Sequence, residues 1–148
     1  MARTPAILLV EDNPDDALLV AKAAQATLAG IPVSLVTNGP EAIRYLQGEG
    51  TYADRTLYPF PDIILLDLRL PLMNGIDVLH WIRSQAGLKR LPVIVLSGST
   101  LPEDTQRAYE AGANSYLVKP VDFTGMLRTM KDMGDFWLRG TRLPDASA

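Results

Sequence analysis

Five polar side chains stand directly after short apolar runs of this sequence: Glu11, Asp12, Asp67, Ser97 and Lys119. Short apolar runs bounded by polar residues are typical of buried strands. In an open parallel sheet, sites form beyond the carboxyl ends of the strands, where side chains from separate segments meet. We therefore expect these five side chains, which come from four segments of the chain, to lie together at one rim of a sheet.

The chemistry open to this set is the handling of a phosphoryl group. Three crowded carboxylates raise each other's pKa values unless a cation lies among them. Mg²⁺ suits such a place because it binds one or two carboxylates together with phosphate oxygens and water. Lys119 adds a second positive centre that can stabilise charge on the phosphoryl oxygens. One carboxylate can itself accept the group as an acyl phosphate, and Ser97 can offer it a hydroxyl.

The elements that must position these residues alternate along the chain. Short apolar runs cover 6–10, 33–36, 62–66, 92–96 and, more weakly, 115–118. Helical candidates lie after them at 14–28, 40–47, 75–84, 101–111 and 121–138. Apolar runs without alternation are typical of strands that helices cover on both faces. Strict alternation of strands and helices predicts an α/β fold, a doubly wound five-stranded parallel sheet.

Local signals support these boundaries. Asn13 is a helix-capping residue, and Pro14 behind it favours the first helical position. Gly30 and Gly112 stand just past two predicted helix ends, where glycine is favoured. The stretch 48–61 is long for a connection in such a fold, so we expect an ordered or functional surface loop there.

Length and composition favour one globular domain. The chain has 148 residues, 47% of them apolar and 21% charged, which is close to ordinary usage. We assign 1–140 to this domain and 141–148 to a flexible tail, and we expect no output domain. Seventeen acids against fourteen bases give a net charge of -3, which disfavours nucleic acid as a partner. Because cysteine is absent and no apolar run reaches spanning length, we expect a cytoplasmic protein that does not enter the membrane.

Taken together, the motifs resemble the receiver domain of bacterial two-component response regulators. The matching motifs are Glu11-Asp12, Asp67 with Pro71 and Asn74-Gly75, Ser97-Gly98, and Tyr116 with Lys119-Pro120. They occur in the family's order over residues 6–138. The resemblance implies a (βα)5 flavodoxin-like fold, Mg²⁺ as cofactor and a phosphoryl group received from a sensor histidine kinase. It also implies that the protein is no enzyme beyond catalysing its own phosphorylation and dephosphorylation.

The resemblance assigns the acidic residues and one carbonyl to the acceptor and its metal. Asp67 is the implied phosphoacceptor and also a metal ligand. Asp12 binds Mg²⁺ directly, Glu11 supports the metal, and the backbone carbonyl of Arg69 is a further ligand. Arg69 is also a departure within the family, at a position that varies and influences how long the phosphate survives.

The resemblance assigns the remaining residues to the phosphate and to a switch. Lys119 contacts the phosphate. Ser97 and Tyr116 form a switch pair, in which the new charge draws Ser97 inward and frees space for Tyr116 to turn in. The peptide bond between Lys119 and Pro120 matches a cis bond of the family, which helps to aim the lysine.

Two short segments narrow the relative further. The loop 57–61 and the helix end 135–138 resemble the small single-domain regulators partnered with bacterial phytochrome histidine kinases. In that subgroup the domain commonly dimerises through its fourth helix, fifth strand and fifth helix. The last predicted helix has more apolar residues than one buried stripe needs, so we place a dimer surface at Phe136 and Trp137.

Simpler interpretations of single residues stand beside these. Asp67 can be a strand-end cap, and Tyr116 can be a core aromatic. Acids at the start of the first helix are stabilised by its positive end, a role that we give to Asp15 and Asp16. His80 has no second histidine or any cysteine with which to share a metal, so we expect it at the surface or half-buried.

Two rival functions fit the same fold class. A flavodoxin-like protein that binds FMN needs a Ser/Thr/Gly-rich phosphate loop after the first strand, where this chain has acidic residues 11–12. A phosphatase with an aspartyl nucleophile typically shows an Asp-x-Asp pattern, where this chain has Arg69 two residues beyond Asp67. This chain therefore lacks, for each rival function, a residue type that its chemistry requires.

Overall fold

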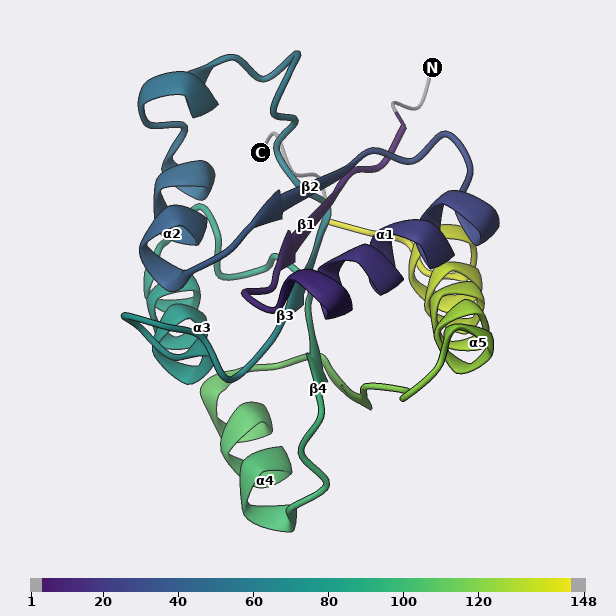
Figure 1. The fold of residues 1–148 in the computed structure, drawn as a ribbon. Coiled ribbons are helices and arrows are strands. Elements are labelled where there is room, and N and C mark those ends of the chain that lie inside the picture. Colours follow the sequence, from purple (N-terminus) through teal and green to yellow (C-terminus); the bar gives the residue numbers. More distant parts are fainter. Residues whose placement is uncertain (1–3, 145–148) are drawn as a thin grey trace.

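Five strands and five α-helices alternate through the computed structural model, which describes residues 4–144 (Figure 1). The strands are β1 (Ile7–Val10), β2 (Val33–Val36), β3 (Ile63–Leu66), β4 (Val93–Ser97) and β5 (Ser115–Val118). The helices are α1 (Pro14–Thr27), α2 (Gly39–Gln47), α3 (Gly75–Ser84), α4 (Pro102–Ala111) and α5 (Phe123–Met133). A short 3-10 helix, η1 (Gly50–Ala53), lies between α2 and β3, and a π-helical segment, η2 (Gly134–Gly140), follows α5. The predicted elements are confirmed, with ends within two residues of the prediction everywhere except at the end of the last helix.

The five strands form one parallel sheet in the order β2-β1-β3-β4-β5. The chain moves from β1 to one side and then crosses to β3 on the other side, so the strand order reverses between these two strands. A crevice forms at such a switch point, outside the carboxyl ends of the strands. The predicted doubly wound fold is confirmed, and it directs the site to the ends of β1 and β3.

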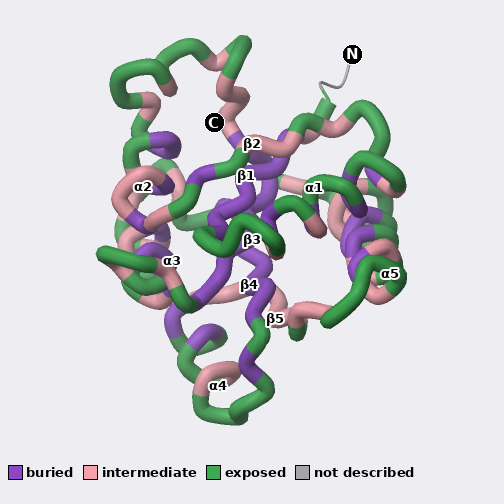
Figure 2. The backbone as a smooth tube through the Cα atoms, viewed as in Figure 1, coloured by how far each residue is buried: buried purple, intermediate pink, exposed green. Residues whose placement is uncertain are grey.

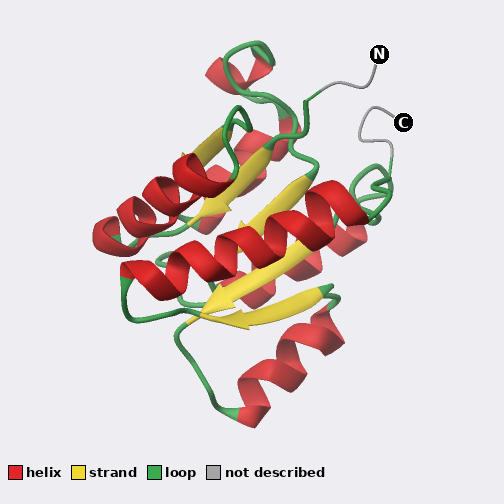
Figure 3. Cartoon of the chain, turned by 90° about the vertical axis from the view of Figure 1, so that its right-hand side faces the viewer, coloured by secondary structure: helices red, strands yellow, loops and turns green. Residues whose placement is uncertain are grey.

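Two layers of helices cover the sheet. Helices α1 and α5 lie together on one face, and α2, α3 and α4 lie on the other (Figures 1 and 3). Leu8 and Leu66 pack into the apolar layer under α2 and α3, whereas Leu9 and Leu65 pack under α1 and α5. Because both faces are covered, successive residues of β1 and β3 are all buried (Figure 2). This explains why the apolar runs do not alternate.

The long connection between α2 and β3 is ordered, as predicted. Tyr45, Tyr52 and Tyr58 pack ring against ring, with centroids 4.9 to 6.1 Å apart. The guanidinium of Arg55 lies over the rings of Tyr45 and Phe60 at 5.5 and 5.4 Å. One tilted and two edge-to-face ring contacts, together with this guanidinium, hold the loop against α2.

The end of the chain differs most from the prediction. The α-helix ends at Met133 and continues as the wider η2. At Gly134 a Cβ would collide with the side chain of Leu28, which follows the last residue of α1, so glycine allows the close approach of the two helices. Leu143 packs against the layer between α1 and α5, so the predicted tail is partly anchored. Its residues 145–148 lie outside the described part of the chain. Across residues 4–144, no helix is long and apolar enough to cross a membrane.

Candidate functional site

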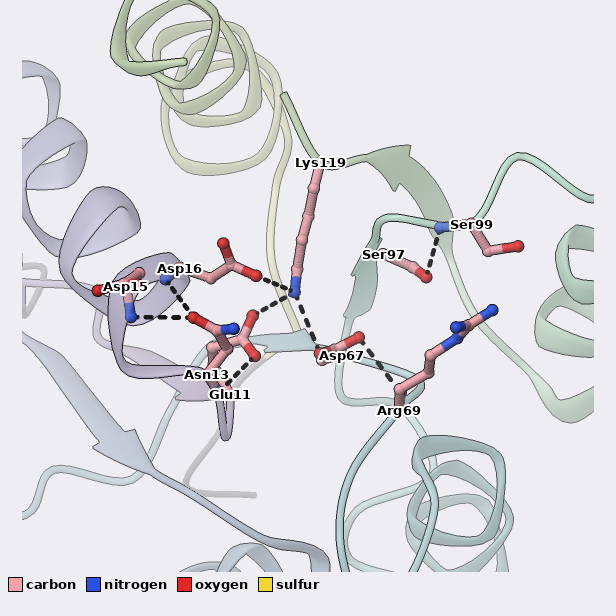
Figure 4. Close-up of polar contacts among 9 residues, drawn as sticks. All are labelled: Glu11, Asn13, Asp15, Asp16, Asp67, Arg69, Ser97, Ser99 and Lys119. Atoms are coloured by element: carbon pink, nitrogen blue, oxygen red, sulfur yellow. Dashed lines mark hydrogen bonds and ion pairs between the residues drawn. The ribbon is translucent and has the colours of Figure 1, made fainter. Parts of the chain in front are cut away.

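The predicted side chains meet at the carboxyl end of the sheet (Figure 4). Glu11 follows β1, Asp67 follows β3, Ser97 ends β4 and Lys119 follows β5. Glu11 and Ser97 are 1% exposed and Asp67 is 5% exposed. Buried polar groups of this kind require partners. Glu11 and Asp67 find theirs in the ammonium of Lys119, and Ser97 finds its partner in the backbone amide of Ser99.

Three carboxylates form the acidic part of the site. Glu11, Asp12 and Asp67 each offer an oxygen, and these oxygens all lie within 4.8 Å of one another. Asp12 is exposed, whereas the other two are buried, so one side of the cluster is open to solvent. The backbone amide of Arg69 donates to Asp67 Oδ1 at 3.2 Å. An all-oxygen set with an open side fits Mg²⁺, which keeps several of its waters.

Lys119 extends its ammonium into this cluster. Its Nζ lies 2.6 Å from Glu11 Oε1, 2.9 Å from Asp16 Oδ2 and 3.1 Å from Asp67 Oδ2. Burial of Lys119 opposes its charge, yet the hydrogen bonds from the ammonium to Glu11 and Asp16 outweigh burial and hold the pKa of Lys119 above its usual range. The lysine is therefore a fixed positive charge beside Asp67.

Glu11 is the member of the cluster most affected by its surroundings. Burial raises the pKa of Glu11 to about 7, although the hydrogen bond from Lys119 opposes the rise and the charge of Asp67 adds to it. The backbone amide of Asn13 donates to Glu11 Oε2 at 3.1 Å. The charge on Glu11 thus changes near neutral pH, and a cation beside it would favour the ionised form.

Helix starts on both sides fix the backbone of the site. Asn13 caps α1 by accepting from the amides of Asp15 and Asp16 at 2.9 and 3.0 Å. Asn74 caps α3, and Gly75 is the first residue of that helix. Gly75 lies against the segment that follows β3. A Cβ on Gly75 would collide with the carbonyl oxygen of Asp67 and lie 2.7 Å from the Cα of Leu68. The Asn74-Gly75 motif therefore lets α3 begin in contact with the residue that carries the chemistry.

A cavity of about 280 Å³ opens beside these groups. It is lined by Asp16, Asp67, Arg69, Gly98, Ser99 and Lys119. An entering group thus meets a carboxylate, an ammonium and a loop backbone together. This arrangement suits an anion that bonds to Asp67 while Lys119 compensates its charge.

Ser97 and Tyr116 are linked through Ser99 rather than directly. The amide of Ser99 donates to Ser97 Oγ at 3.2 Å, and the hydroxyl of Tyr116 donates to the carbonyl of Ser99 at 2.9 Å. The hydroxyl of Ser99 donates to Asp104 in the first turn of α4 at 2.5 Å and accepts from the amide of Leu101 at 3.2 Å. The loop after β4 therefore connects the site to the start of α4.

Comparison with known proteins agrees with this geometry. The family model described as the response regulator receiver domain matches residues 7–131. The chain belongs to this receiver family. It is a response-regulator receiver domain and not a conventional enzyme, with strands in the flavodoxin-like order.

The similar receivers include regulators of light signalling and one of another pathway. The chain is 39% identical over 139 residues to the probable methanogenesis regulatory protein FilR2 of Methanothrix harundinacea, covering 93% of this chain and 86% of that protein. It is 35% identical over 140 residues to the response regulator Rcp1 of Synechocystis, covering 95% of this chain and 93% of that protein. The crystal structure of Rcp1 in its Mn²⁺-bound form superposes with a TM-score of 0.84 over 95% of this chain and 99% of that one. The phosphorylated cyanobacterial phytochrome response regulator RcpA is 38% identical, with a TM-score of 0.88 over 97% and 100% of the two chains. Among receivers, this chain is therefore close to the phytochrome-associated group.

One prediction about this receiver domain is wrong in the structure. No cis peptide bond occurs in residues 4–144, so the bond between Lys119 and Pro120 is trans. The trans form is the more stable one for most bonds before proline. The amide of Lys119 donates to the carbonyl of Ser97 at 2.7 Å, and three carboxylates hold its ammonium. Lys119 is thus aimed at Asp67 with a trans bond.

The two aromatics predicted for a dimer surface lie in different environments. Phe136 is 62% exposed, whereas Trp137 packs against the layer between α1 and α5. Their rings pack edge to face with centroids 5.2 Å apart. His80 is exposed, in agreement with the sequence interpretation. The backbone carbonyl of Arg69 as a metal ligand stays a prediction.

Sequence reasoning missed two residues of this receiver site. Asp16 was assigned to the helix end alone, yet it forms an ion pair with Lys119. Ser99 was given no role, yet its backbone and side chain bridge Ser97, Tyr116 and α4. Asp12 precedes α1, which begins at Pro14, so no local spacing links Asp16 to the site. Its contact with Lys119 arises from the packing of segments that are distant in the sequence.

Proposed function

We propose that Asp67 accepts a phosphoryl group from the phosphohistidine of a sensor kinase. The observation that carries the proposal is the environment of its carboxylate, which is buried at the switch point with Lys119 Nζ 3.1 Å from one oxygen and the amide of Arg69 3.2 Å from the other. In the transfer an oxygen of Asp67 bonds to phosphorus while the bond from phosphorus to the histidine nitrogen breaks, and the nitrogen keeps the electron pair. The product is an acyl phosphate on Asp67.

Glu11, Asp12 and Asp67 would hold Mg²⁺ in this receiver, with the carbonyl of Arg69 as a further ligand. The donor set consists of oxygens only, and Rcp1, a similar protein, has been crystallised in a Mn²⁺-bound form. The bound ion neutralises charge that develops on the phosphoryl oxygens. Lys119 does the same from the other side, because its ammonium already lies next to Asp67.

Phosphorylation then acts on the loop that begins at Ser97. In the unphosphorylated structure the hydroxyl oxygen of Ser97 accepts from the amide of Ser99. A phosphoryl group on Asp67 offers new acceptors to this hydroxyl. The hydroxyl of Tyr116 is bonded to the carbonyl of Ser99, so a shift of Ser99 moves the anchor of Tyr116. The switch pair would in this way bias the surface of α4 and β5 through protein contacts.

A phytochrome-type histidine kinase is the partner that we propose. RcpA is a phytochrome response regulator by its own description, and a cytoplasmic location would follow from such a partner. Exposed apolar side chains surround the rim of the site, where a donor helix can pack. They are Leu18 on α1, Leu72 before α3, and Val121 before α5. A partner that packs there would remove this apolar surface from water, which favours association.

We also propose a homodimer through α4, β5 and α5. A groove of about 430 Å³ lies between β5 and the helical segments α5 and η2, lined in part by Leu117, Met133, Phe136 and Trp137. Tyr109 on α4 and Val118 on β5 are also exposed. Light scattering of wild type and of Phe136→Ser checks this surface: the variant should have the mass of a monomer at concentrations where the wild type is a dimer. A monomeric wild type at all concentrations, with and without phosphate, would contradict the dimer.

Phosphate uptake tests the proposed function. The protein is incubated with acetyl phosphate, with and without Mg²⁺, and separated on a phosphate-affinity gel. Wild type should shift only with Mg²⁺, and Asp67→Asn should not shift. Asp54→Asn, which changes an exposed aspartate of the loop before β3, should shift like wild type. Equal uptake by Asp67→Asn and Asp54→Asn would overturn the proposal.

A further inference from the structure

Among the ion-pair partners of Lys119 in residues 4–144, Asp16 alone does not belong to the acidic triad of Glu11, Asp12 and Asp67. Lys119 Nζ lies 2.9 Å from Asp16 Oδ2, shorter than its 3.1 Å distance to Asp67. Asp16 reaches the ammonium from α1, whereas Asp67 reaches it from β3 (Figure 4). Asp16 also lines the cavity that opens beside Asp67. It is therefore in direct contact with the lysine and at the edge of the reaction space.

The partners of Lys119 change once the proposed site is in use. Glu11 and Asp67 belong to the triad whose oxygens lie within 4.8 Å of one another, so a divalent cation there would draw on both of their charges. Phosphorylation would also engage the carboxylate of Asp67, because one of its oxygens bonds to phosphorus. Asp16 is outside the triad, so its carboxylate keeps its full charge for the ammonium. The side chain of Asp16 is 38% exposed and that of Lys119 is 12% exposed, so the pair is partly shielded from water, and a charge-assisted hydrogen bond of this kind fixes the position of the ammonium.

We propose that Asp16 is the positioning residue for Lys119 during phosphoryl transfer to Asp67. This inference rests on the proposed function and adds one residue to it. Asp16 anchors the ammonium from the α1 side, so that Lys119 can donate to the incoming phosphoryl oxygens from a fixed position. Asp16 acts through Lys119 and does not itself bond to phosphate, because two anions repel.

The chain supplies a matched control in the preceding residue. Asp15 lies in the same first turn of α1, and the amides of both aspartates donate to Asn13 Oδ1. Within residues 4–144, Lys119 forms ion pairs with Glu11, Asp16 and Asp67 and none with Asp15. Asp15→Asn and Asp16→Asn thus remove the same charge from the same helix end, and only Asp16→Asn removes the anchor of Lys119.

The first experiment separates the rate of transfer from metal affinity. Phosphorylation of the full chain by acetyl phosphate is followed at saturating Mg²⁺, and the dissociation constant for Mg²⁺ is measured by calorimetry. Asp16→Asn should slow phosphorylation about fivefold relative to Asp15→Asn, the order expected for one charge-assisted hydrogen bond that is partly exposed. The Mg²⁺ dissociation constants of the two variants should agree within about twofold, because neither residue is in the triad. Equal rates in the two variants would overturn the inference.

The second experiment observes the lysine directly. The ¹H–¹⁵N signal of the Lys119 ammonium, assigned by its loss in Lys119→Arg, reports how fast the ammonium protons exchange with water. Asp16→Asn should accelerate this exchange, and Asp15→Asn should leave it as in the wild type. Unchanged exchange in Asp16→Asn would contradict the anchoring role. The signal does not depend on phosphorylation, so a wild type that took up no phosphate would overturn the proposed function while this measurement still decided the role of Asp16.

Discussion

The carboxylate of Glu11 lies 2.6 Å from the ammonium of Lys119, with Glu11 only 1% exposed. The pair joins the end of β1 to the segment after β5 across the sheet. Because Asp67 lies 3.1 Å from the same ammonium, the lysine compensates two carboxylates at once. One ammonium faces three carboxylates, so the site keeps an excess of negative charge, and a divalent cation that enters has to redistribute these contacts.

Mg²⁺ affinity should depend on pH around neutrality. Burial raises the pKa of Glu11 to about 7, and a protonated carboxyl cannot support a cation. The affinity should fall about tenfold between pH 8 and pH 6, because the ionised fraction of Glu11 falls by that factor. Calorimetry at the two pH values measures the change. Glu11→Gln should bind more weakly and show a smaller change; an equally steep dependence in Glu11→Gln would assign the effect to another group.

The stability of the protein without divalent cations should show the opposite side of the same linkage. The folded-state pKa of Glu11 lies above its ordinary value of 4.5, so its contribution is present at low pH and is lost as pH rises through about 7. Between pH 6 and pH 8 this loss should amount to about 1 kcal/mol. Urea unfolding in the presence of a chelator measures it. If wild type and Glu11→Gln lose the same stability over this range, the raised pKa is contradicted.

Gly75→Ala should destabilise the fold at the acceptor itself. The added Cβ would collide with the carbonyl of Asp67 and approach the Cα of Leu68, and overpacking of this kind costs about 1–3 kcal/mol. Gly87→Ala is the control, since nothing lies within 4 Å of its Cβ position, and its effect should stay within about 0.5 kcal/mol. Denaturant unfolding compares the two variants. Equal effects would mean that α3 is not held against Asp67 as the structure shows.

Ser99→Ala should loosen the start of α4. The change removes the hydroxyl that donates to Asp104 and accepts from the amide of Leu101, and each lost hydrogen bond costs about 1 kcal/mol. Hydrogen exchange of the first turn of α4 should accelerate, with that of α3 unchanged. Thr100→Ala, at the exposed neighbouring position, should leave exchange as in the wild type. The same exchange in both variants would contradict the link between this loop and α4.

Much of the fold and of the site was predictable because both follow from local pattern. Strands covered on both faces produce continuous apolar runs, and the residues after those runs had to meet at one rim. Glu11, Asp67 and Lys119 were placed in this way, and the structure brings them into contact. The helix starts at Asn13 and Asn74 depend only on short-range hydrogen bonds, so the residues next to them in the sequence indicate where these helices begin.

The remaining features depend on contacts between segments that are distant in the sequence. Asp16 finds Lys119 only because α1 and the end of β5 pack at the same rim. The wide turn of η2 begins where Gly134 meets Leu28 at the end of α1, a contact that has no signature within the last helix.

Chemical mapping of the phosphorylated residue tests directly whether Asp67 is the phosphoacceptor. After incubation with acetyl phosphate and Mg²⁺, borohydride reduces an acyl phosphate of aspartate to homoserine, which peptide mass spectrometry locates in the sequence. Phosphate on a serine hydroxyl survives this treatment, so the method separates Asp67 from Ser97 and Ser99, which lie beside it. We expect homoserine at position 67 and at no other aspartate. Reduction at another aspartate, or phosphate retained on a serine with Asp67 intact, would contradict it.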